Sequence, residues 1–235
     1  MKHPGFLAWL LMAAAVVGGI APGTGWTADE DRFRTQRERL IGDIEADVQV
    51  TSERIGRKAL APLVMEAMRR VPRHEFVPEA QKPYAYENRP LPIGYGQTIS
   101  QPYIVALMIE AAQIKPGDRV LDVGTGSGYA AAVLSRLAGR VYSIERHRDL
   151  ADSAKRALEK LRYANVEVRH GDGTLGWTDA APFDAILVAA GGPEIPEALR
   201  RQLNIGGRLI IPIGELGVIQ ELVKVVRDGA DRFHE

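Results

Sequence analysis

Residues 119–128 read RVLDVGTGSG, and the rest of this chain of 235 residues is organised around them. The apolar residues before the glycines predict a short buried strand, and the glycine cluster predicts a tight turn. The alanine-rich, apolar residues 129–137 predict a helix directly after that turn. Glycines let a backbone approach a ligand closely, and the free amides at a helix N-terminus face it. The stretch therefore predicts a strand–turn–helix unit that binds a nucleotide.

The spacing of the glycines indicates which class of nucleotide the loop can bind. The dinucleotide fingerprint G-x-G-x-x-G would need glycine where this chain has Tyr129, and no Lys-Ser or Lys-Thr pair of a phosphate-binding loop follows. Asp122 would repel a pyrophosphate, but it could accept hydrogen bonds from an ammonium group or a ribose. S-adenosylmethionine carries a sulfonium and no phosphate, so it suits this loop, with NAD as the alternative. The pattern resembles the first motif of the class I methyltransferases, with Gly124, Thr125 and Gly126 in its turn.

The composition excludes several classes of protein. Lys plus Arg and Asp plus Glu both total 30, so no basic excess indicates nucleic-acid binding. The absence of cysteine removes disulfides, thiolate catalysis and cysteine-ligated metals, and the 5 histidines form no metal-binding motif. A hydrophobic content of 46% is that of a globular protein. We therefore expect a globular protein without a metal site or a nucleic-acid partner. We also expect it to be a monomer.

The N-terminal residues predict a secretory signal peptide. Lys2 and His3 precede an apolar run over residues 6–20, and small residues follow over residues 21–25. The run is shorter than the ~20 residues that a spanning helix needs, so an uncleaved membrane anchor is the weaker alternative. We expect residues 1–25 to be removed and the chain to be exported, to the periplasm, without stable membrane association. If the segment is not a working signal, the chain stays in the cytoplasm.

Residues 26–115 are predicted to form N-terminal helices and a substrate loop. A charged stretch over residues 27–51 has apolar residues at helical spacing, which predicts a surface helix with one buried stripe. A second helix is predicted over residues 54–70. The 6 prolines in residues 71–102 predict an extended, ordered loop with no regular element, and a loop this long is usually functional. The buried stripe of the first helix is predicted to contain Leu40, Ile41, Ile44 and Val48.

Residues 116–235 are predicted to form the nucleotide-binding core. Short apolar runs alternate with helical patterns, so we expect an α/β protein with a doubly wound, mostly parallel sheet. In such a sheet the ligand lies at the carboxyl ends of the strands. The strands are predicted over residues 120–123, 140–144, 166–169, 183–189, 208–212 and 220–227.

Acidic residues end or follow the first three of these strands. Glu145 lies about twenty residues beyond the glycines, where a carboxylate receives the two ribose hydroxyls of a nucleotide. Asp172 follows the third strand, where a carboxylate or a neighbouring amide can bind the amino edge of adenine. The alternatives are a surface carboxylate beside Arg146 and an ordinary Asp-Gly turn. Together with Asp122, these positions indicate one cofactor site.

Four stretches go beyond a generic nucleotide-binding fold: VPRHEFVP (71–78), PIGYGQTISQP (92–102), GPEIP (192–196) and GGRLIIPIG (206–214). They resemble the protein-L-isoaspartate O-methyltransferase family, and the resemblance covers residues 41–227. It implies a Rossmann-like methyltransferase fold with an N-terminal helical extension and a proline-rich active-site loop. The implied reaction moves a methyl group from S-adenosylmethionine to the free α-carboxylate of an L-isoaspartyl residue in a damaged protein or peptide. The ester then collapses to a succinimide, which hydrolyses partly to aspartate.

The resemblance also implies roles for individual residues. Ser100 falls on the family's active-site serine, with Thr98 and Ile99 beside it as substrate-binding residues. From the residues alone, Ser100 could instead cap the helix that begins near Pro102. His74 either touches substrate or packs between its flanking prolines. Gly124, Gly126, Glu145, Asp172 and Gly173 fall on the family's cofactor positions, and the predicted cofactor site also includes Gln97, Asp122, Thr125 and Gln220.

The chemistry of this substrate needs no general base. An α-carboxyl group has a pKa of about 3.5, so it is already a nucleophile at neutral pH. Catalysis then depends on aligning the carboxylate oxygen, the methyl group and the sulfur. Ser100 would assist by donating a hydrogen bond to the carboxylate.

Three features depart from the resemblance. Gly191 and Gly192 stand where we expect a more alanine-rich pair, and the chain stops at Glu235, so we expect a shortened last strand or an incomplete chain. The signal peptide would require S-adenosylmethionine outside the cytoplasm. Two alternatives therefore stay open: an exported cofactor-binding protein of the same fold without turnover, and a methyltransferase acting on a small molecule or RNA.

Overall fold

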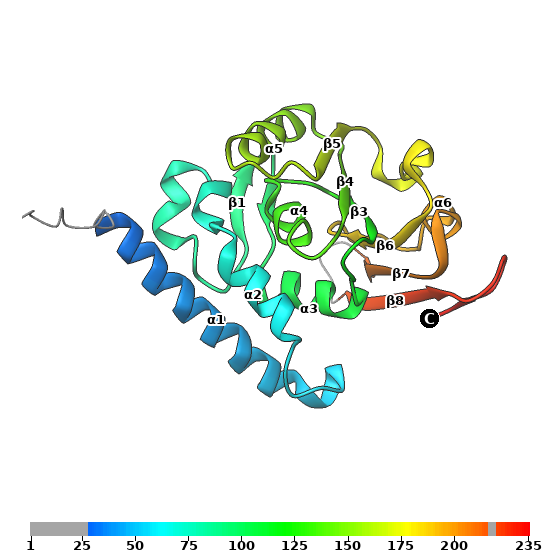
Figure 1. Cartoon of the computed structure of the whole chain (residues 1–235), viewed down its shortest axis with the longest axis horizontal. Coiled ribbons are helices and arrows are strands. Elements are labelled where there is room, and N and C mark those ends of the chain that lie inside the picture. The colour runs from blue at the N-terminus through cyan, green and yellow to red at the C-terminus, as the bar shows by residue number, and fades with distance from the viewer. Residues whose placement is uncertain (1–27, 216–219) are drawn as a thin grey trace, which may run out of the picture.

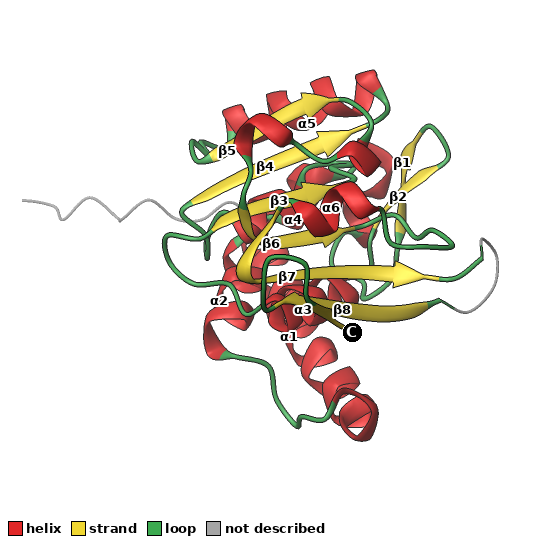
Figure 2. Ribbon diagram, turned by 90° about the vertical axis from the view of Figure 1, so that its right-hand side faces the viewer, coloured by secondary structure: helices red, strands yellow, loops and turns green. Residues whose placement is uncertain are grey.

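A seven-stranded sheet with the order β5-β4-β3-β6-β7-β8-β9 forms the centre of the computed structural model, which describes residues 28–215 and 220–235 (Figures 1 and 2). Strands β3 to β7 run parallel, and β8 and β9 are antiparallel to their neighbours. The prediction of a doubly wound, mostly parallel sheet is confirmed. The strands are β3 (Arg119–Val123), β4 (Arg140–Glu145), β5 (Val166–His170), β6 (Phe183–Val188), β7 (Leu203–Ile213), β8 (Glu221–Arg227) and β9 (Phe233–His234).

The strand order reverses at β3, because β4 and β5 follow on one side of it and β6 and β7 on the other. The loops after β3 and β6 therefore diverge at the carboxyl end of the sheet, where open α/β sheets bind their ligands. Helices cover the sheet: α1 (Ala28–Ile55), α2 (Pro62–Arg70), α3 (Pro102–Ala112), α4 (Tyr129–Leu134), α5 (Arg148–Lys160) and α6 (Glu197–Arg201).

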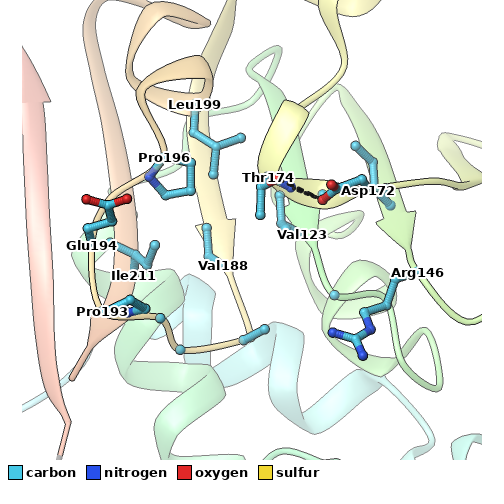
Figure 3. Close-up of a pocket in the computed structure, with 16 residues that line it drawn as sticks. Val123, Arg146, Asp172, Thr174, Val188, Pro193, Glu194, Pro196, Leu199 and Ile211 are labelled. Carbon is cyan, nitrogen blue, oxygen red and sulfur yellow. Dashed lines mark hydrogen bonds between the residues drawn. The ribbon is translucent and has the colours of Figure 1, made fainter. Parts of the chain in front are cut away.

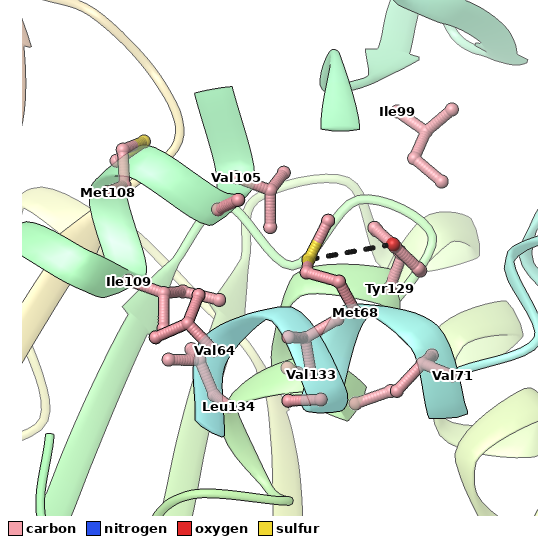
Figure 4. Packing of buried hydrophobic residues seen from close by; sticks show 14 of the residues in the cluster. Val64, Met68, Val71, Ile99, Val105, Met108, Ile109, Tyr129, Val133 and Leu134 are labelled. Atoms are coloured by element: carbon pink, nitrogen blue, oxygen red, sulfur yellow. Dashed lines mark hydrogen bonds between the residues drawn. The ribbon is translucent and has the colours of Figure 1, made fainter. Parts of the chain in front are cut away.

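Two hydrophobic clusters occupy the two faces of the sheet, because successive residues of a strand point to opposite faces. Val120 of β3 belongs to the cluster that includes helices α1 to α5, whereas Leu121 and Val123 belong to the cluster with Leu199 of α6. Figure 4 shows the first cluster where α2 meets α4. There the Tyr129 hydroxyl donates a weak hydrogen bond to Met68 Sδ, 3.9 Å away.

The long N-terminal helix confirms the predicted buried stripe. Helix α1 lies against α2 and α3 (Figure 1), and all four apolar residues of the predicted stripe are buried. The predicted start of the second helix at residue 54 is wrong. Helix α1 continues to Ile55 and ends at Gly56, which has a φ of +68°. Helix α2 begins at Pro62, because proline suits the first turn of a helix.

The prediction of an irregular loop over residues 71–102 is also wrong. The prolines prevent long elements but permit short ones, since Pro72 and Pro78 each precede a 3-10 helix. The loop contains η1 (Arg73–Phe76), η2 (Glu79–Tyr84) and a hairpin of β1 (Leu91–Gly94) and β2 (Gln97–Ile99). Figure 2 shows this hairpin beyond the carboxyl ends of the parallel strands.

The remaining boundaries differ little from prediction, with one exception. Strand β7 begins at Leu203 rather than at residue 208, with a register irregularity in its pairing to β6. The last strand, β9, has 2 residues and pairs with β8. The predicted signal peptide at residues 1–25 lies outside the described residues. Among the helices that the structure describes, none has the length and hydropathy to span a membrane.

We expect Val48→Ala to lower the free energy of unfolding by about 1.5–3 kcal/mol, because Val48 lies on the buried face of α1 and is 2% exposed. Val50→Ala is the matched control: Val50 lies on the same helix but is 84% exposed, so its effect should stay within about 0.5 kcal/mol. Both variants change helix propensity equally, so their difference isolates burial. Urea titration measures both, and equal effects would contradict the packing of α1.

Candidate active site

The glycine-rich loop after β3 is held by Glu145, which ends β4. One carboxylate oxygen, Oε2, accepts a hydrogen bond from the Gly126 amide at 2.8 Å, and Oε1 accepts one from the His147 amide at 2.9 Å. Gly124 and Gly126 have φ values of +93° and +53°, in the left-handed region that favours glycine. Glu145 is 4% exposed and lines a cavity, so its carboxylate lies where a ribose would meet it.

Asp122 lies behind this loop rather than on its surface. It pairs in register with Ser143 of β4, and the Ser143 hydroxyl donates a hydrogen bond to Asp122 Oδ2 at 2.6 Å. The Ser143 and Thr125 hydroxyls are also 2.6 Å apart. The pKa of Asp122 is raised to about 6, chiefly by burial; the Ser143 hydrogen bond opposes this rise and the nearby charge of Glu145 adds to it. At 1% exposure Asp122 lines neither cavity described below, so its place favours support of the loop over direct contact with a ligand.

Two adjoining compartments open at the carboxyl end of the sheet. The larger, of about 500 Å³, lies between the loops after β5 and β6 (Figure 3). The smaller, of about 100 Å³, lies between the β1–β2 hairpin and the glycine loop. Gly124, Arg146 and Ala190 line both, so the two compartments share these residues as walls; together we call them the cleft. Its size is typical of a small-molecule site.

The larger compartment has mostly apolar walls and two carboxylates, those of Asp172 and Glu194. Asp172 Oδ1 accepts hydrogen bonds from the Thr174 amide at 2.9 Å and the Thr174 hydroxyl at 2.8 Å, and these bonds lower the pKa of Asp172 (Figure 3). Gly173 has no room for a side chain, because a Cβ there would lie 2.4 Å from Val123 Cγ1. The apolar side chains around this compartment include Val123, Val188, Leu199 and Ile211, which suit a flat ring such as adenine.

The smaller compartment brings the predicted substrate residues to the glycine loop. Ser100 lines it together with Gly126 and Glu145, although they lie far apart in the sequence. Gln101, not Ser100, is the N-cap of α3, and it makes no side-chain cap. Within the described residues the Ser100 hydroxyl therefore has no helix amide to cap and is available to a ligand. The other predicted residues that line this compartment are Gln97, Thr98, Ile99, Gly124 and Thr125.

Two other predicted residues, Gln220 and His74, do not line either compartment. Gln220 packs against Gly191, where a Cβ would lie 2.2 Å from Gln220 Nε2, so it supports the outer wall of the larger compartment. His74 stacks on Phe33, with ring centroids 3.9 Å apart, and its Nδ1 lies 2.7 Å from the Tyr86 hydroxyl. Burial lowers its pKa to about 4. His74 therefore packs against Phe33 and Tyr86 and lines neither compartment, which favours the interpretation as a packed residue.

Sequence reasoning missed Arg146 and Arg73. Arg146 lines both compartments, and the rule that ligands bind at carboxyl ends of strands would have found it, since it directly follows β4. Arg73 lies in the stretch VPRHEFVP (71–78), but its spacing from other residues indicated no role for it. Its Nη2 donates a hydrogen bond to the Ser100 carbonyl at 2.8 Å.

We expect Asp122→Asn to remove a pH dependence of stability. A carboxyl whose pKa rises from 3.8 to about 6 on folding contributes stability that is complete below pH 3.8 and is lost as the pH rises through 6. At about 1.4 kcal/mol per pKa unit, the loss amounts to about 3 kcal/mol. Urea titrations from acid to neutral pH should show wild type losing that amount relative to Asp122→Asn.

Asp172→Asn is the control of opposite sign. In wild type the pKa of Asp172 is lowered on folding. The stability that this carboxylate contributes is therefore present above its ordinary pKa of 3.8 and is lost as the pH falls. A constant difference between wild type and Asp122→Asn across this range would contradict the burial of a titrating carboxyl.

Comparison with known proteins places the chain in a family. A family model described as Protein-L-isoaspartate(D-aspartate) O-methyltransferase matches residues 48–235. The chain is 51% identical over 227 residues to protein-L-isoaspartate O-methyltransferase 2 of Syntrophobacter fumaroxidans, covering 97% of this chain and 90% of that protein. It is 54% identical over 187 residues to the protein of the same name from Pelobacter propionicus, covering 80% and 83%.

Solved structures show the same fold. The chain superposes on a protein-L-isoaspartate O-methyltransferase with a TM-score of 0.70 at 34% identity, covering 82% of this chain and 60% of that one. The Plasmodium falciparum beta-aspartate methyltransferase, crystallised in complex with S-adenosyl-L-homocysteine, gives a TM-score of 0.68 at 26% identity, covering 84% and 92%. The chain belongs to the protein-L-isoaspartate(D-aspartate) O-methyltransferase family.

Proposed function

We propose that this chain transfers a methyl group from S-adenosylmethionine to the free α-carboxylate of L-isoaspartyl residues in damaged proteins, which begins their repair through a succinimide. The observation that carries the proposal is the meeting of Ser100 with Gly126 and Glu145 around one small compartment. A donor on the glycine loop and an acceptor at Ser100 would then lie side by side. Family membership supplies the substrate class.

The cofactor side of the cleft fits S-adenosylmethionine. Glu145 offers carboxylate oxygens toward the ribose, and the apolar larger compartment beside Asp172 suits the adenine ring. The left-handed turn at Gly124 and Gly126 lets the backbone approach the methionine part. When bound, the cofactor supplies a methyl group on a positively charged sulfur.

The smaller compartment, on the substrate side of the cleft, needs only to orient the carboxylate anion of the substrate. The isoaspartyl α-carboxylate is already ionised at neutral pH, and among the described residues no histidine or lysine lines the smaller compartment. Ser100 donates a hydrogen bond to one carboxylate oxygen and leaves the other free to attack. Thr98 and Ile99 form the wall beside it. Alignment of this kind can contribute roughly 7–11 kcal/mol in favourable systems.

We also propose that the chain is exported to the periplasm as a monomer and leaves the membrane after cleavage. Residues 1–25 support export through their basic start, apolar run and small residues. Cell fractionation of the chain with and without residues 1–25 tests this part of the proposal. Recovery of both forms from the cytoplasm would contradict it.

The proposed reaction predicts transfer of labelled methyl groups to a peptide with one isoaspartyl residue. The same peptide with a normal aspartyl residue is the control and should stay unlabelled. Label on neither peptide, with S-adenosylhomocysteine binding intact, would instead support a cofactor-binding protein without turnover. Label only on small molecules or RNA would support a different methyltransferase.

We expect Ser100→Ala to lower kcat/KM for the isoaspartyl peptide about 100-fold, because it removes one donor to the reacting carboxylate. Its affinity for S-adenosylhomocysteine, measured by calorimetry, should not change. Ser153→Ala on the exposed side of α5 is the control and should leave both quantities at wild-type values. Wild-type turnover in Ser100→Ala would remove the catalytic role of this hydroxyl.

A further inference from the structure

Arg73 is a fully buried arginine behind the active-site loop. Its relative exposure is 0%, and it is the first residue of η1. Buried arginines are rare unless a carboxylate accompanies them. Among the described residues, none forms an ion pair with Arg73. Burial is the main influence on its pKa and lowers it, and the other groups that act on it are the hydroxyls of Tyr129 and Tyr86.

The guanidinium of Arg73 joins three separate parts of the chain. Nε donates to the Ala85 carbonyl at 2.9 Å, and Nη2 donates to the Ser100 carbonyl at 2.8 Å and, more weakly, to the Arg89 carbonyl at 3.5 Å. Arg89 and Ser100 flank the β1–β2 hairpin on its two sides. One rigid side chain therefore fixes both ends of the hairpin that presents the substrate residues. Lysine could not do this, because its single nitrogen lacks the planar fork.

Arg73 also connects the hairpin to the glycine loop. Its Cζ lies 4.7 Å from the centre of the Tyr129 ring, a cation–π contact with the first residue of α4. Tyr129 itself lines the smaller compartment. Arg73 Nη1 is buried and has no hydrogen-bond partner among the described residues. The cation is therefore held against both walls of the smaller compartment, and its charge is not neutralised there by the part of the chain that the structure describes.

An arginine stays protonated at neutral pH, so a positive charge lies directly behind Ser100. Attraction between charges is strong where water is excluded. The substrate of the proposed reaction brings a carboxylate to the other side of the same residue. The buried positive charge of Arg73 is costly in the free protein. When substrate binds, this charge would be attracted to the substrate carboxylate.

We propose that Arg73 is a positioning residue for methyl transfer: it fixes the Ser100 loop against α4 and places a positive charge behind the site of the isoaspartyl carboxylate. The inference rests on the proposed function. It predicts that Arg73 acts on the substrate and on turnover, and not on the cofactor.

The test compares Arg73→Lys and Arg73→Ala with wild type in kcat, KM for an isoaspartyl peptide and affinity for S-adenosylhomocysteine. Arg73→Lys keeps the charge but loses the fork, so kcat should fall about tenfold with a smaller change in KM. Arg73→Ala loses both, so KM should also rise, by about tenfold or more. Affinity for S-adenosylhomocysteine should stay within about threefold of wild type in each variant.

Chemical rescue distinguishes positioning from general structural support. Millimolar guanidinium should restore part of the turnover of Arg73→Ala, because the cation can occupy the space that the side chain leaves. It should not restore Arg73→Met, in which an apolar side chain fills that space. If Arg73→Ala does not fold, the kcat and KM of Arg73→Lys still decide the question.

Arg227→Ala is the matched control. Arg227 also donates hydrogen bonds to main-chain carbonyls, from Nη1 to the Leu203 oxygen at 2.6 Å and from Nη2 to the Ala230 oxygen at 2.7 Å. It lies at the end of β8 and lines neither compartment. Its loss should lower the melting temperature and leave kcat and KM unchanged. Wild-type kcat and KM in Arg73→Lys and Arg73→Ala, or a parallel loss of cofactor affinity and turnover in both, would overturn the inference. Failure of wild type to methylate the isoaspartyl peptide would count against the proposed function instead.

Discussion

The two hydrogen bonds that Glu145 accepts are the constraint on which the rest of the site depends. Its carboxylate joins the amides of Gly126 and His147, and so connects the loop after β3 to the start of α5. These loops follow the neighbouring parallel strands β3 and β4 at the carboxyl end of the sheet. Without a common acceptor, these two partly buried amides would lack a partner within the described residues. The carboxylate therefore fixes the cofactor side of the cleft before any ligand arrives.

The opposite wall is built in a different way. The β1–β2 hairpin belongs to no larger sheet, and its position depends on side chains beneath it. Arg73 fixes its two ends, and Ile93 packs on the glycine loop, where its Cδ1 would lie 3.3 Å from a Cβ at Gly126. The cofactor side of the cleft is thus part of the central sheet, whereas the hairpin side is held in place by tertiary contacts. Ser100 lies on the second wall and Glu145 on the first.

The contrast explains how much the sequence could predict. The mostly parallel sheet and the place of Glu145 could be predicted from short-range signals. These signals are the glycine spacing, the alternation of strands and helices, and the rule that ligands bind at the carboxyl ends of strands. The place of Arg73, and with it the position of the hairpin on the core, could not be predicted, because Arg73 bonds to partners 12 to 27 residues away in the sequence. Asp122 was predicted to end the strand before the glycine loop and to bind the cofactor, but it lines neither compartment. Strand alternation directs it, with its register partner Ser143, to the face opposite Val123.

The contact between Gly173 and Val123 has a consequence for how such enzymes can diverge. Since a Cβ at residue 173 would lie 2.4 Å from Val123 Cγ1, the two positions are sterically coupled. An alanine at 173 is tolerable only after 123 has become smaller, and that first step leaves a hole in the floor of the adenine-sized compartment. Evolution at these two sites is therefore epistatic, and the order of substitutions decides which sequences are reachable.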